Sequence, residues 1–427
     1  MRETDALVQE TLVTHELDSG LKVTVVPRPG QRRTYATFAT AYGSIDSHFQ
    51  LPRTGETVEV PDGIAHFLEH KMFEKPDRDV LQEFGRYGAS ANAYTEYLTT
   101  TFLFSTTSDV SECLNLLLDY VQDPYFTPET VEKEKGIIEQ EIRMYLDMPG
   151  DRVHSNLMRA LYVKHPARLD IAGSVESIRS ITAPMLYQCY ETFYHPSNMW
   201  VVVVGDLDPD AVIQQVVDNQ TPKDYRRQPP IPRLLPEEPE GVAEPRIESH
   251  MALALPVMAI GYKDPVHDLR GGALLRRELA TDLMWNMVLG KSSPLFYELY
   301  RSGLINDRFG AHYAAASTFA NSVLSGETPD PDRLGDALDE GFRTVTFSEE
   351  AFQRHKKREL GDYVTLFNNP GQLAYLFNSL AVRGIGLFEY RDALEAITVQ
   401  DVEARWQEHV RPDRRAVAVV WPETRSS

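Results

Sequence analysis

Cysteine is scarce in this chain of 427 residues, which contains only Cys113 and Cys189. The two lie far apart and outside any CxxC spacing, so the sequence argues against a disulfide framework, and we expect both thiols to be reduced. The chain also lacks an apolar run as long as a membrane span, and its first twenty residues lack the apolar core of a signal peptide. We therefore expect a cytoplasmic protein.

Basic residues are outnumbered by acidic ones, 43 against 63, which gives a formal net charge of −20 and a pI near 5.1. This balance argues against nucleic acid or an anionic membrane surface as the main partner, because phosphate groups are bound by basic surfaces. It mildly favours basic or neutral peptides over acidic ones as ligands of an interior site.

Length and local composition predict two domains. A chain of this size is too long for one ordinary core, and residues 225–248 are rich in proline and glutamate, which is typical of a semi-rigid linker. We expect an N-terminal domain over residues 1–224 and a C-terminal domain over residues 249–427. The two halves resemble each other, because residues 126–142 match residues 347–363 in pattern. This repeat indicates duplication of one α/β unit.

Each domain is predicted to be an α+β sandwich, with helices packed on a mixed, mainly antiparallel sheet. Apolar runs predict the strands, and apolar residues at helical spacing predict the helices. In the first domain the expected strands cover residues 22–27, 34–43, 99–107 and 199–207. The expected helices cover the motif described next and residues 80–88, 111–122, 134–141 and 184–194.

The most informative motif is HFLEH, from His66 to His70, within the run GIAHFLEHKMFEK. Turn residues precede it and its apolar residues recur at helical spacing, so the motif is predicted to lie on a helix. Side chains three and four apart share one helix face, which brings His66, Glu69 and His70 together. Two imidazoles and a carboxylate form most of a hydrolytic zinc site, here in the order of the inverzincins. The alternative is a pair of structural histidines on an amphipathic helix.

A catalytic zinc site usually has a third protein ligand. The best candidate lies on a predicted helix in which Thr127 is the N-cap and Pro128 the first helical residue. Glu134 and Glu141 are two turns apart on one face of this helix, and the surrounding GIIEQEI indicates that the face is buried. A carboxylate on a buried face needs a partner, and a metal ion is one. A solvated acidic face is the alternative.

With four further stretches, HFLEH resembles the insulysin–pitrilysin family of zinc metallopeptidases, which includes the mitochondrial processing peptidase, over essentially the full chain. The stretches are ASANAYTEYLTTTFLF, VEKEKGIIEQEIRMYLDMPGD, HPARLDIAGSVESI and ETFYHPSNMWVVVVGDLD. The resemblance is closest to bacterial members with a single pair of repeats. It implies one Zn²⁺ per chain bound by His66, His70 and Glu141. It also implies Glu69 as general base, with Glu134 as a supporting carboxylate.

The resemblance places a further stretch, Asn92, Ala93 and Tyr94, along the substrate. The run ASANAYTEYLTTTFLF is predicted to be a strand entered from a turn rich in small residues. An exposed strand edge near zinc binds an extended peptide through backbone hydrogen bonds and tolerates many sequences. For Asn92 the alternative is a turn residue without a role in binding.

The family fold implies two α/β domains that form half of a clamshell around a chamber, which a dimer completes. Active members commonly place an arginine and a tyrosine of the second domain near the scissile bond. Residues 311–338 contain no such pair at the family's spacing, since Arg333 is expected to begin a helix and Tyr313 has no arginine partner at that interval in the sequence. We therefore expect the metal-bearing subunit of a heterodimer with a homologous metal-free subunit. A homodimer is the alternative.

The expected activity is hydrolysis of peptides or small unfolded polypeptides by a zinc metalloendopeptidase. One alternative is a non-catalytic peptide-binding or assembly subunit with a vestigial metal site. Another is a zinc hydrolase that acts on something other than peptides. Two imidazoles and a carboxylate suit zinc, although cobalt or manganese also binds such ligands in vitro.

Overall fold

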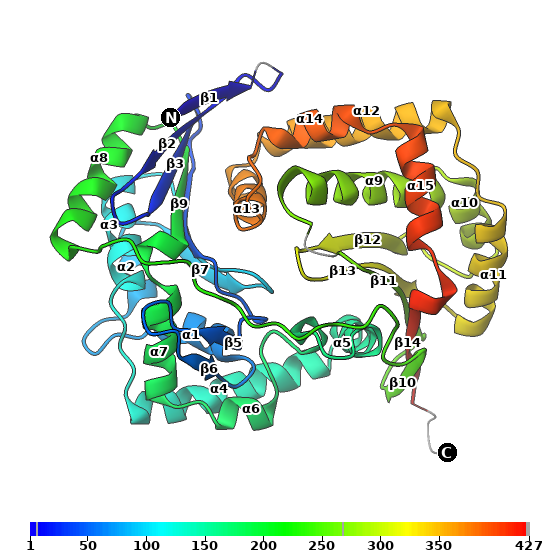
Figure 1. Ribbon diagram of the computed structural model, residues 1–427, viewed down its shortest axis with the longest axis horizontal. Helices are drawn as coiled ribbons and strands as arrows, with labels where there is room; N and C mark the ends of the chain where they lie inside the picture. The colour runs from blue at the N-terminus through cyan, green and yellow to red at the C-terminus, as the bar shows by residue number, and fades with distance from the viewer. Residues whose placement is uncertain (6, 267–268, 424–427) are drawn as a thin grey trace. The chain divides into compact units, whose positions relative to one another are not determined.

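The computed structural model describes residues 1–5, 7–266 and 269–423. Its internal contacts divide the chain into two compact units, each made of segments that are separate in the sequence (Figure 1). Unit 1 consists of Met1–Ile142, Asp170–Leu235 and Val364–Val382. Unit 2 consists of Arg143–Leu169, Pro236–Tyr363 and Arg383–Ser427.

Unit 1 is built on one mixed sheet. Its strands lie in the order β1 (Arg2–Asp5), β2 (Glu10–Glu16), β3 (Lys22–Pro27), β9 (Met199–Gly205), β4 (Thr34–Thr40), β8 (Thr100–Thr106) and β7 (Ser90–Thr95). Strands β3 and β9 pair in parallel, and the other neighbours pair antiparallel. Strands β5 (His48–Gln50) and β6 (Thr57–Glu59) form a separate hairpin. The four strands predicted from the sequence are thus confirmed as β3, β4, β8 and β9.

Helices cover both faces of this sheet. They are α1 (Ile64–Met72), α2 (Val80–Arg86), α3 (Val110–Val121), α4 (Pro128–Leu146), α6 (Val175–Arg179), α7 (Ala183–Phe193), α8 (Pro209–Gln220) and α13 (Pro370–Ala381), with the 3-10 turns Pro196–Asn198 and Thr221–Lys223. Side chains alternate between the faces of a strand. On β4, Phe38 enters the core beneath α1 and α3, whereas Thr37 contacts Asn378 of α13. Asn378 also accepts a hydrogen bond of 2.8 Å from Trp200 Nε1, which fixes α13 on the second face.

Unit 2 repeats the plan with a second sheet, in the order β10 (Arg246–Met251), β14 (Arg415–Pro422), β11 (Val257–Asp264), β13 (Ala320–Glu327) and β12 (Gly310–Ala315). Its helices are α5 (Pro149–Leu161), α9 (Gly271–Leu289), α10 (Pro294–Arg301), α11 (Pro331–Arg343), α12 (Glu349–Leu366), α14 (Glu389–Ala396) and α15 (Val399–His409), with the 3-10 turns Pro166–Arg168 and Pro412–Arg414. Strands β10 and β14 are parallel, and the other pairs are antiparallel. Two sandwiches of helices on mixed sheets confirm the predicted α+β class.

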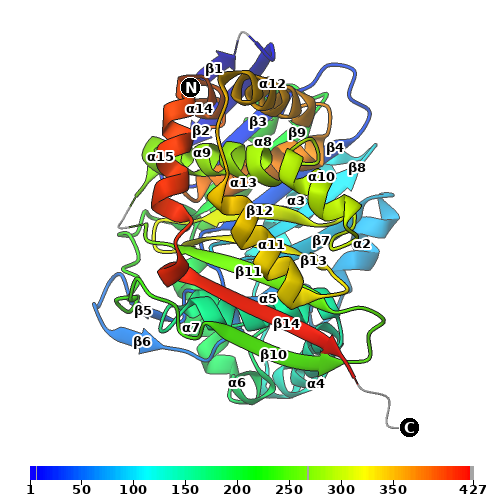
Figure 2. The ribbon, with the colours of Figure 1, turned by 90° about the vertical axis from the view of Figure 1, so that its right-hand side faces the viewer.

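The two units exchange one helix each. Helix α5 follows α4 in the first half of the sequence but packs on β14, β11 and β10 of unit 2, beside which it is drawn in Figure 2. Helix α13 follows α12 in the second half but packs on β9 and β4 of unit 1. Gly261 of β11 is needed for the first contact, because a Cβ atom there would lie 2.7 Å from Leu161 of α5. Neither half of the sequence therefore contains a complete unit.

A buried polar network holds unit 2 together around Asp264, at the end of β11. Its carboxylate accepts hydrogen bonds from Tyr313 of β12 at 2.6 Å and from Arg277 of α9 at 2.9 Å. Arg405 of α15 also pairs with it, and His409 lies nearby. Burial opposes the charged form, but these hydrogen bonds and the arginine charges hold the pKa of Asp264 far below its ordinary range.

Replacing Asp264 by asparagine is expected to lower the free energy of unfolding of unit 2 by about 3–5 kcal/mol, because the buried Arg405 and the partly buried Arg277 lose their buried counter-charge and keep only the exposed carboxylate of Glu408. In the wild type the depressed pKa means that this stabilisation is complete above the unfolded-state pKa of about 3.9 and is lost as the pH falls below it. Urea denaturation followed by tryptophan fluorescence at pH 7 and pH 3 measures both effects. Asp362→Asn, at an exposed pair with Arg358, is the control.

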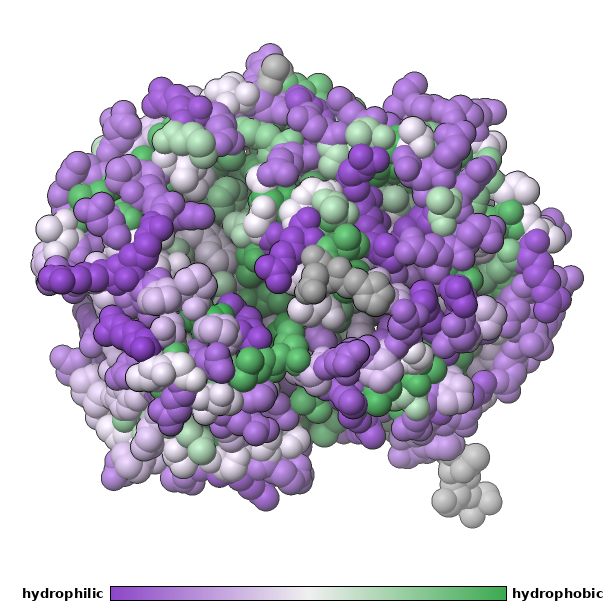
Figure 3. All heavy atoms as spheres, in the orientation of Figure 1, coloured by the Kyte–Doolittle hydropathy of each residue, from purple (hydrophilic) through white to green (hydrophobic). Residues whose placement is uncertain are grey.

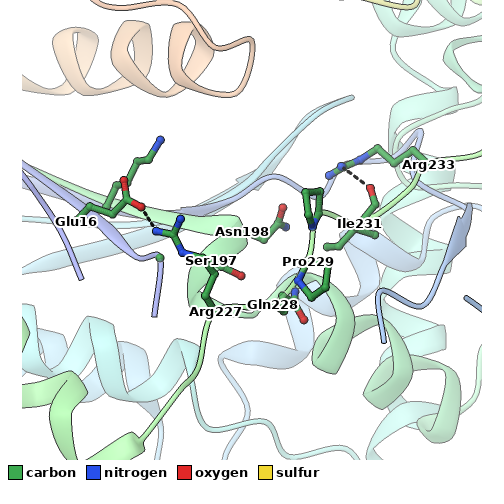
Figure 4. Close-up of a pocket in the computed structure, with 11 residues that line it drawn as sticks. Glu16, Ser197, Asn198, Arg227, Gln228, Pro229, Ile231 and Arg233 are labelled. Atoms are coloured by element: carbon green, nitrogen blue, oxygen red, sulfur yellow. Dashed lines mark hydrogen bonds and ion pairs between the residues drawn. The ribbon is translucent and has the colours of Figure 1, made fainter. Parts of the chain in front are cut away.

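The proline-rich segment after α8 runs along both units without regular structure from residue 224 to 245, apart from an isolated bridge at Arg233. In unit 1, Arg233 Nε donates to Asp46 at 2.7 Å, and the segment lines a pocket of about 480 Å³ with Glu16 and Asn198 (Figure 4). In unit 2, Glu238 accepts backbone hydrogen bonds from residues 163–165. The segment is therefore anchored on each unit by a charged side chain.

Hydrophilic side chains dominate the face of the molecule drawn in Figure 3, in keeping with the high content of acidic residues. In the part of the chain that the structure describes, no helix is long and apolar enough to cross a bilayer.

Candidate metal centre

The HFLEH motif forms most of helix α1, as predicted. The helix begins after Gly63, whose φ of 86° lies in the left-handed region that favours glycine. A side chain at this position would also meet the carbonyl oxygen of Ala172, 2.4 Å from an added Cβ. The tight entry directs His66 and Glu69 into the protein, where both are buried, with His70 partly exposed beside them.

Helix α4 brings Glu141 to the two histidines. The Glu141 carboxylate lies 3.7 Å from His66 Nε2 and 3.2 Å from His70 Nε2. The hydroxyl of Thr127 caps the start of α4 by accepting from Thr130 N, as the sequence predicts. On α4, Ile138 is buried, but Ile137 is 47% exposed, so only part of the expected buried face is buried.

Glu134 lies behind the cluster rather than in it. Its carboxylate is 3.0 Å from His70 Nδ1, so it orients the ring while Nε2 points toward Glu141. Burial opposes protonation of His70, yet its hydrogen bonds with Glu134 and Glu141 raise its pKa to about 10. Burial and the neighbouring His70 lower the pKa of His66 to about 4, so the His66 ring is a neutral donor at pH 7.

These residues fit a zinc ion. One donor atom from each of His66, His70 and Glu141 lies within 4.8 Å of the other two. Tetrahedral ligands about 2.1 Å from zinc stand roughly 3.4 Å apart, close to the two separations measured here. The cluster holds an excess of negative charge, because the carboxylates of Glu134 and Glu141 lie against the two imidazoles and Glu69 lies nearby, and this excess creates a demand for a positive group. A dication bound by these three side chains would satisfy that demand.

Glu69 points toward a different neighbour. Its Oε2 accepts a hydrogen bond of 2.6 Å from the hydroxyl of Thr95, the last residue of β7. Burial raises the pKa of Glu69, while the hydrogen bond from Thr95 opposes that rise. One carboxylate oxygen is thus fixed by the sheet, and Glu69 is left outside the group of metal donors. The sequence reasoning missed Thr95, although alternation along the strand places it on the same face as Ala93.

Strand β7 contains the three residues that the resemblance assigned to substrate. It is the last strand of the sheet, so its outer edge has no neighbouring strand in the described sheet order. Asn92 is exposed, Ala93 is buried in the core beside α1, and Tyr94 contacts Tyr375 of α13 on the opposite face. The structure divides the expected single strand into the hairpin β7–β8, because Glu96 and Thr99 close a tight turn between them.

Unit 2 has a different chemistry. His66, His70 and Glu141 form the one cluster of potential metal donors found among the described residues, and the counterpart of Glu141, Asp362, is exposed. Tyr313 is buried with its hydroxyl on Asp264, and Arg333 lies exposed in the first turn of α11, as expected of a residue that begins a helix. Tyr313 and Arg333 therefore do not form the arginine–tyrosine pair that an active site of this kind would contain.

Known proteins share this sequence and fold. The family description "Insulinase (Peptidase family M16)" matches residues 53–174, and "Peptidase M16 inactive domain" matches residues 180–359. The uncharacterized zinc protease YmfH of Bacillus subtilis (strain 168) is 43% identical over 419 residues, which are 98% of this chain and 98% of YmfH. A crystal structure of an M16-like peptidase from Alicyclobacillus acidocaldarius has a TM-score of 0.93 and 38% identity, over 97% of this chain and 99% of that one.

A protease from Helicobacter pylori shares the fold, with a TM-score of 0.81 and 19% identity over 96% of this chain and 99% of its own. The resemblance inferred from HFLEH and its companion stretches is confirmed by matches that extend over both halves of the sequence. This chain belongs to the insulinase family of peptidases, family M16.

Proposed function

We propose that the chain is a zinc-dependent endopeptidase that cleaves peptides or small unfolded polypeptides. The observation that carries the proposal is the convergence, within unit 1, of His66, His70 and Glu141 beside a second, buried carboxylate, Glu69. Several relatives of the chain are named zinc proteases, which supports zinc as the metal. One ion per chain is proposed, because one cluster of three donors is found among the described residues. The cytoplasmic location stays a prediction from the sequence.

When bound, zinc supplies a Lewis acid that activates water and polarises a carbonyl group. Glu69 accepts a proton from the attacking water and returns it to the nitrogen of the leaving amine. Thr95 keeps one oxygen of Glu69 occupied, so the other oxygen is the one free for proton transfer. Glu134 holds the His70 ring in the orientation that a ligand needs.

Strand β7 is proposed to receive the substrate along its outer edge, next to Asn92, Ala93 and Tyr94. An extended peptide there would extend the sheet through backbone hydrogen bonds, which do not depend on side chains. The position suits peptides better than compact folded proteins or small non-peptide molecules, because it demands an extended backbone.

We further propose that the chain works as the metal-bearing subunit of a dimer, inside a chamber that a second subunit completes. The motivating observation is that the hydroxyl of the buried Tyr313 donates a hydrogen bond to Asp264, so it does not take part in a reaction. A homologous metal-free subunit that supplies an arginine and a tyrosine would provide what is missing. A homodimer is the alternative.

The test measures zinc content and cleavage of internally quenched peptides by the purified chain, alone and with its co-purifying partner. We expect about one zinc per chain and cleavage that is lost with a chelator and restored by zinc. Cleavage that appears only with the partner supports the heterodimer, and full activity of the chain alone contradicts it. Absence of both zinc and cleavage in every combination would favour the alternative of a peptide-binding or assembly subunit.

Replacing Thr95 by valine is expected to lower kcat about tenfold with little change in KM, because Glu69 loses a hydrogen bond to a charged group. Thr95→Ser restores the hydroxyl and is expected to recover most of the rate. Steady-state kinetics on one quenched peptide measure both variants. Equal losses in the serine and valine variants would show that Thr95 acts through packing.

Replacing Glu134 by glutamine is expected to weaken zinc binding about 10- to 100-fold, as removal of an orienting partner does in other zinc proteins. The shape of the residue is kept, so the fold is expected to survive. Competition with a chromogenic chelator measures the affinity. Glu132→Gln, at a side chain that is 70% exposed on the same helix, is the matched control and is expected to bind zinc as the wild type does.

A further inference from the structure

The face of β7 that points away from the histidine cluster carries a second set of side chains. Thr95 and Ala93 face α1, so Tyr94 faces the other way, toward α13. The ring centroids of Tyr94 and Tyr375 are 6.0 Å apart, and Tyr375 is 50% exposed. The exchanged helix thus brings a residue of the second half of the sequence next to the edge strand of unit 1.

Glu96 lies at the end of this aromatic pair. Its Oε1 accepts a hydrogen bond of 2.7 Å from the hydroxyl of Tyr375, and its Oε2 accepts one of 3.3 Å from Thr99. Both partners are neutral hydroxyls, and none of the ion pairs among the described residues includes Glu96. The carboxylate therefore keeps an uncompensated negative charge at the end of β7, where it is partly exposed.

A peptide on the outer edge of β7 would present alternate side chains to this face. Residues that lie opposite each other on paired strands have Cβ atoms about 4.5–5.5 Å apart, and diagonal neighbours remain within reach of long side chains. Every second side chain of the substrate would thus lie beside Asn92 and Tyr94. A long side chain at such a position would reach Tyr375 and Glu96. The opposite set would face the side of the sheet that carries Glu69.

We propose that Glu96, Tyr94 and Tyr375 form a specificity subsite for a basic substrate side chain, lysine or arginine. This inference rests on the proposed peptidase function and names the substrates it favours. A carboxylate without a counter-charge attracts a cation, and tyrosine faces attract it further through their π electrons. A long aliphatic stem also packs well along the two rings. The charge selects lysine or arginine over an aromatic side chain, which the rings alone would also accept.

The experiment compares fluorescently labelled peptides that carry lysine or its neutral isostere norleucine at each position in turn. Their binding to the zinc-loaded Glu69→Gln chain is measured by fluorescence polarisation, and their cleavage by wild type is measured in parallel. At one or more alternate positions we expect lysine to bind about 10- to 100-fold more tightly than norleucine, the range for a hydrogen bond to a charged group. Added to the Glu69→Gln chain, Glu96→Gln should bring this ratio close to one. Glu96→Lys in the same chain should remove the preference for lysine, and it should bind a third peptide, with glutamate at that position, more tightly than the norleucine peptide.

Glu132→Gln, on an exposed part of α4, is the control and should keep the ratio of the parent chain. Equal affinity for lysine and norleucine at every position overturns the subsite. A ratio that survives Glu96→Gln and Glu96→Lys also overturns it. Binding that follows Glu96 while wild type cleaves none of the peptides, either alone or with its co-purifying partner, supports the subsite and refutes the proposed peptidase function. Failure of the subsite and failure of the peptidase function therefore give different results.

Discussion

Glu69→Gln is expected to lower the rate of peptide hydrolysis by about 100- to 10,000-fold, the contribution of a positioned general acid and base. Zinc should remain at about one ion per chain, because Glu69 is not among the donor atoms of His66, His70 and Glu141. Glutamine has nearly the same shape and its carbonyl oxygen still accepts from Thr95, so the geometry of the site should be retained. What it lacks is the ability to take up a proton.

Hydrolysis of a quenched peptide and metal analysis of the same preparation measure the two quantities together. The control is Glu132→Gln, which makes the same chemical change on an exposed part of α4 and should leave both quantities as in the wild type. A Glu69→Gln chain that cleaves normally would remove Glu69 from the mechanism. A chain that has lost its zinc would instead show that Glu69 supports the metal, and the general base would have to be sought elsewhere.

The sequence was sufficient for the parts of the site that lie within one helix. His66, Glu69 and His70 are three and four residues apart, and Glu134 and Glu141 are seven apart, so helical periodicity alone places each set on one face. The pairing of the two helices came from the family resemblance and from the need for a third ligand. The structure brings the donor atoms together as that reasoning requires.

The parts that could not be predicted depend on contacts between distant segments. Tyr375 follows Glu96 by 279 positions, and its presence beside β7 results from the exchange of α13 between units. Helical periodicity can identify a helix but does not reveal which sheet the helix covers. Thr95 is a different case, because its strand was predicted and only its hydrogen-bond partner on α1, Glu69, was missing. Ile137 shows the converse error, since this apolar residue lies in the predicted buried face but is nearly half exposed.

The two halves of the duplicated sequence share a fold but differ in their buried polar chemistry. Each sheet is covered on one face by a helix from the other half of the sequence, so the packing of both units depends on both repeats. In unit 2 the polar interior is occupied by Asp264 and its arginines, which stabilise the fold. In unit 1 the buried polar side chains near the metal centre are instead His66, Glu69 and Glu134, on α1 and α4.

Glu141→Gln is expected to remove zinc and, with it, peptide hydrolysis. The amide is a poor ligand compared with a carboxylate, and the remaining donors, His66 and His70, come from a single helix. The loss of zinc affinity should exceed the 10- to 100-fold expected for a partner that only orients a ligand. Zinc should therefore bind more weakly to Glu141→Gln than to Glu134→Gln. Competition with a chromogenic chelator provides both affinities on one scale.

The ranking, rather than the loss itself, distinguishes a ligand from a residue that orients one. If Glu134 were the ligand and Glu141 the supporting group, the order of the two affinities would be reversed. The distances favour Glu141, which approaches both histidines on Nε2, whereas Glu134 meets only Nδ1 of His70. Excess zinc should partly restore hydrolysis in Glu134→Gln, because its three ligands remain. It should restore little in Glu141→Gln, where a ligand is missing from the site that holds the metal beside Glu69.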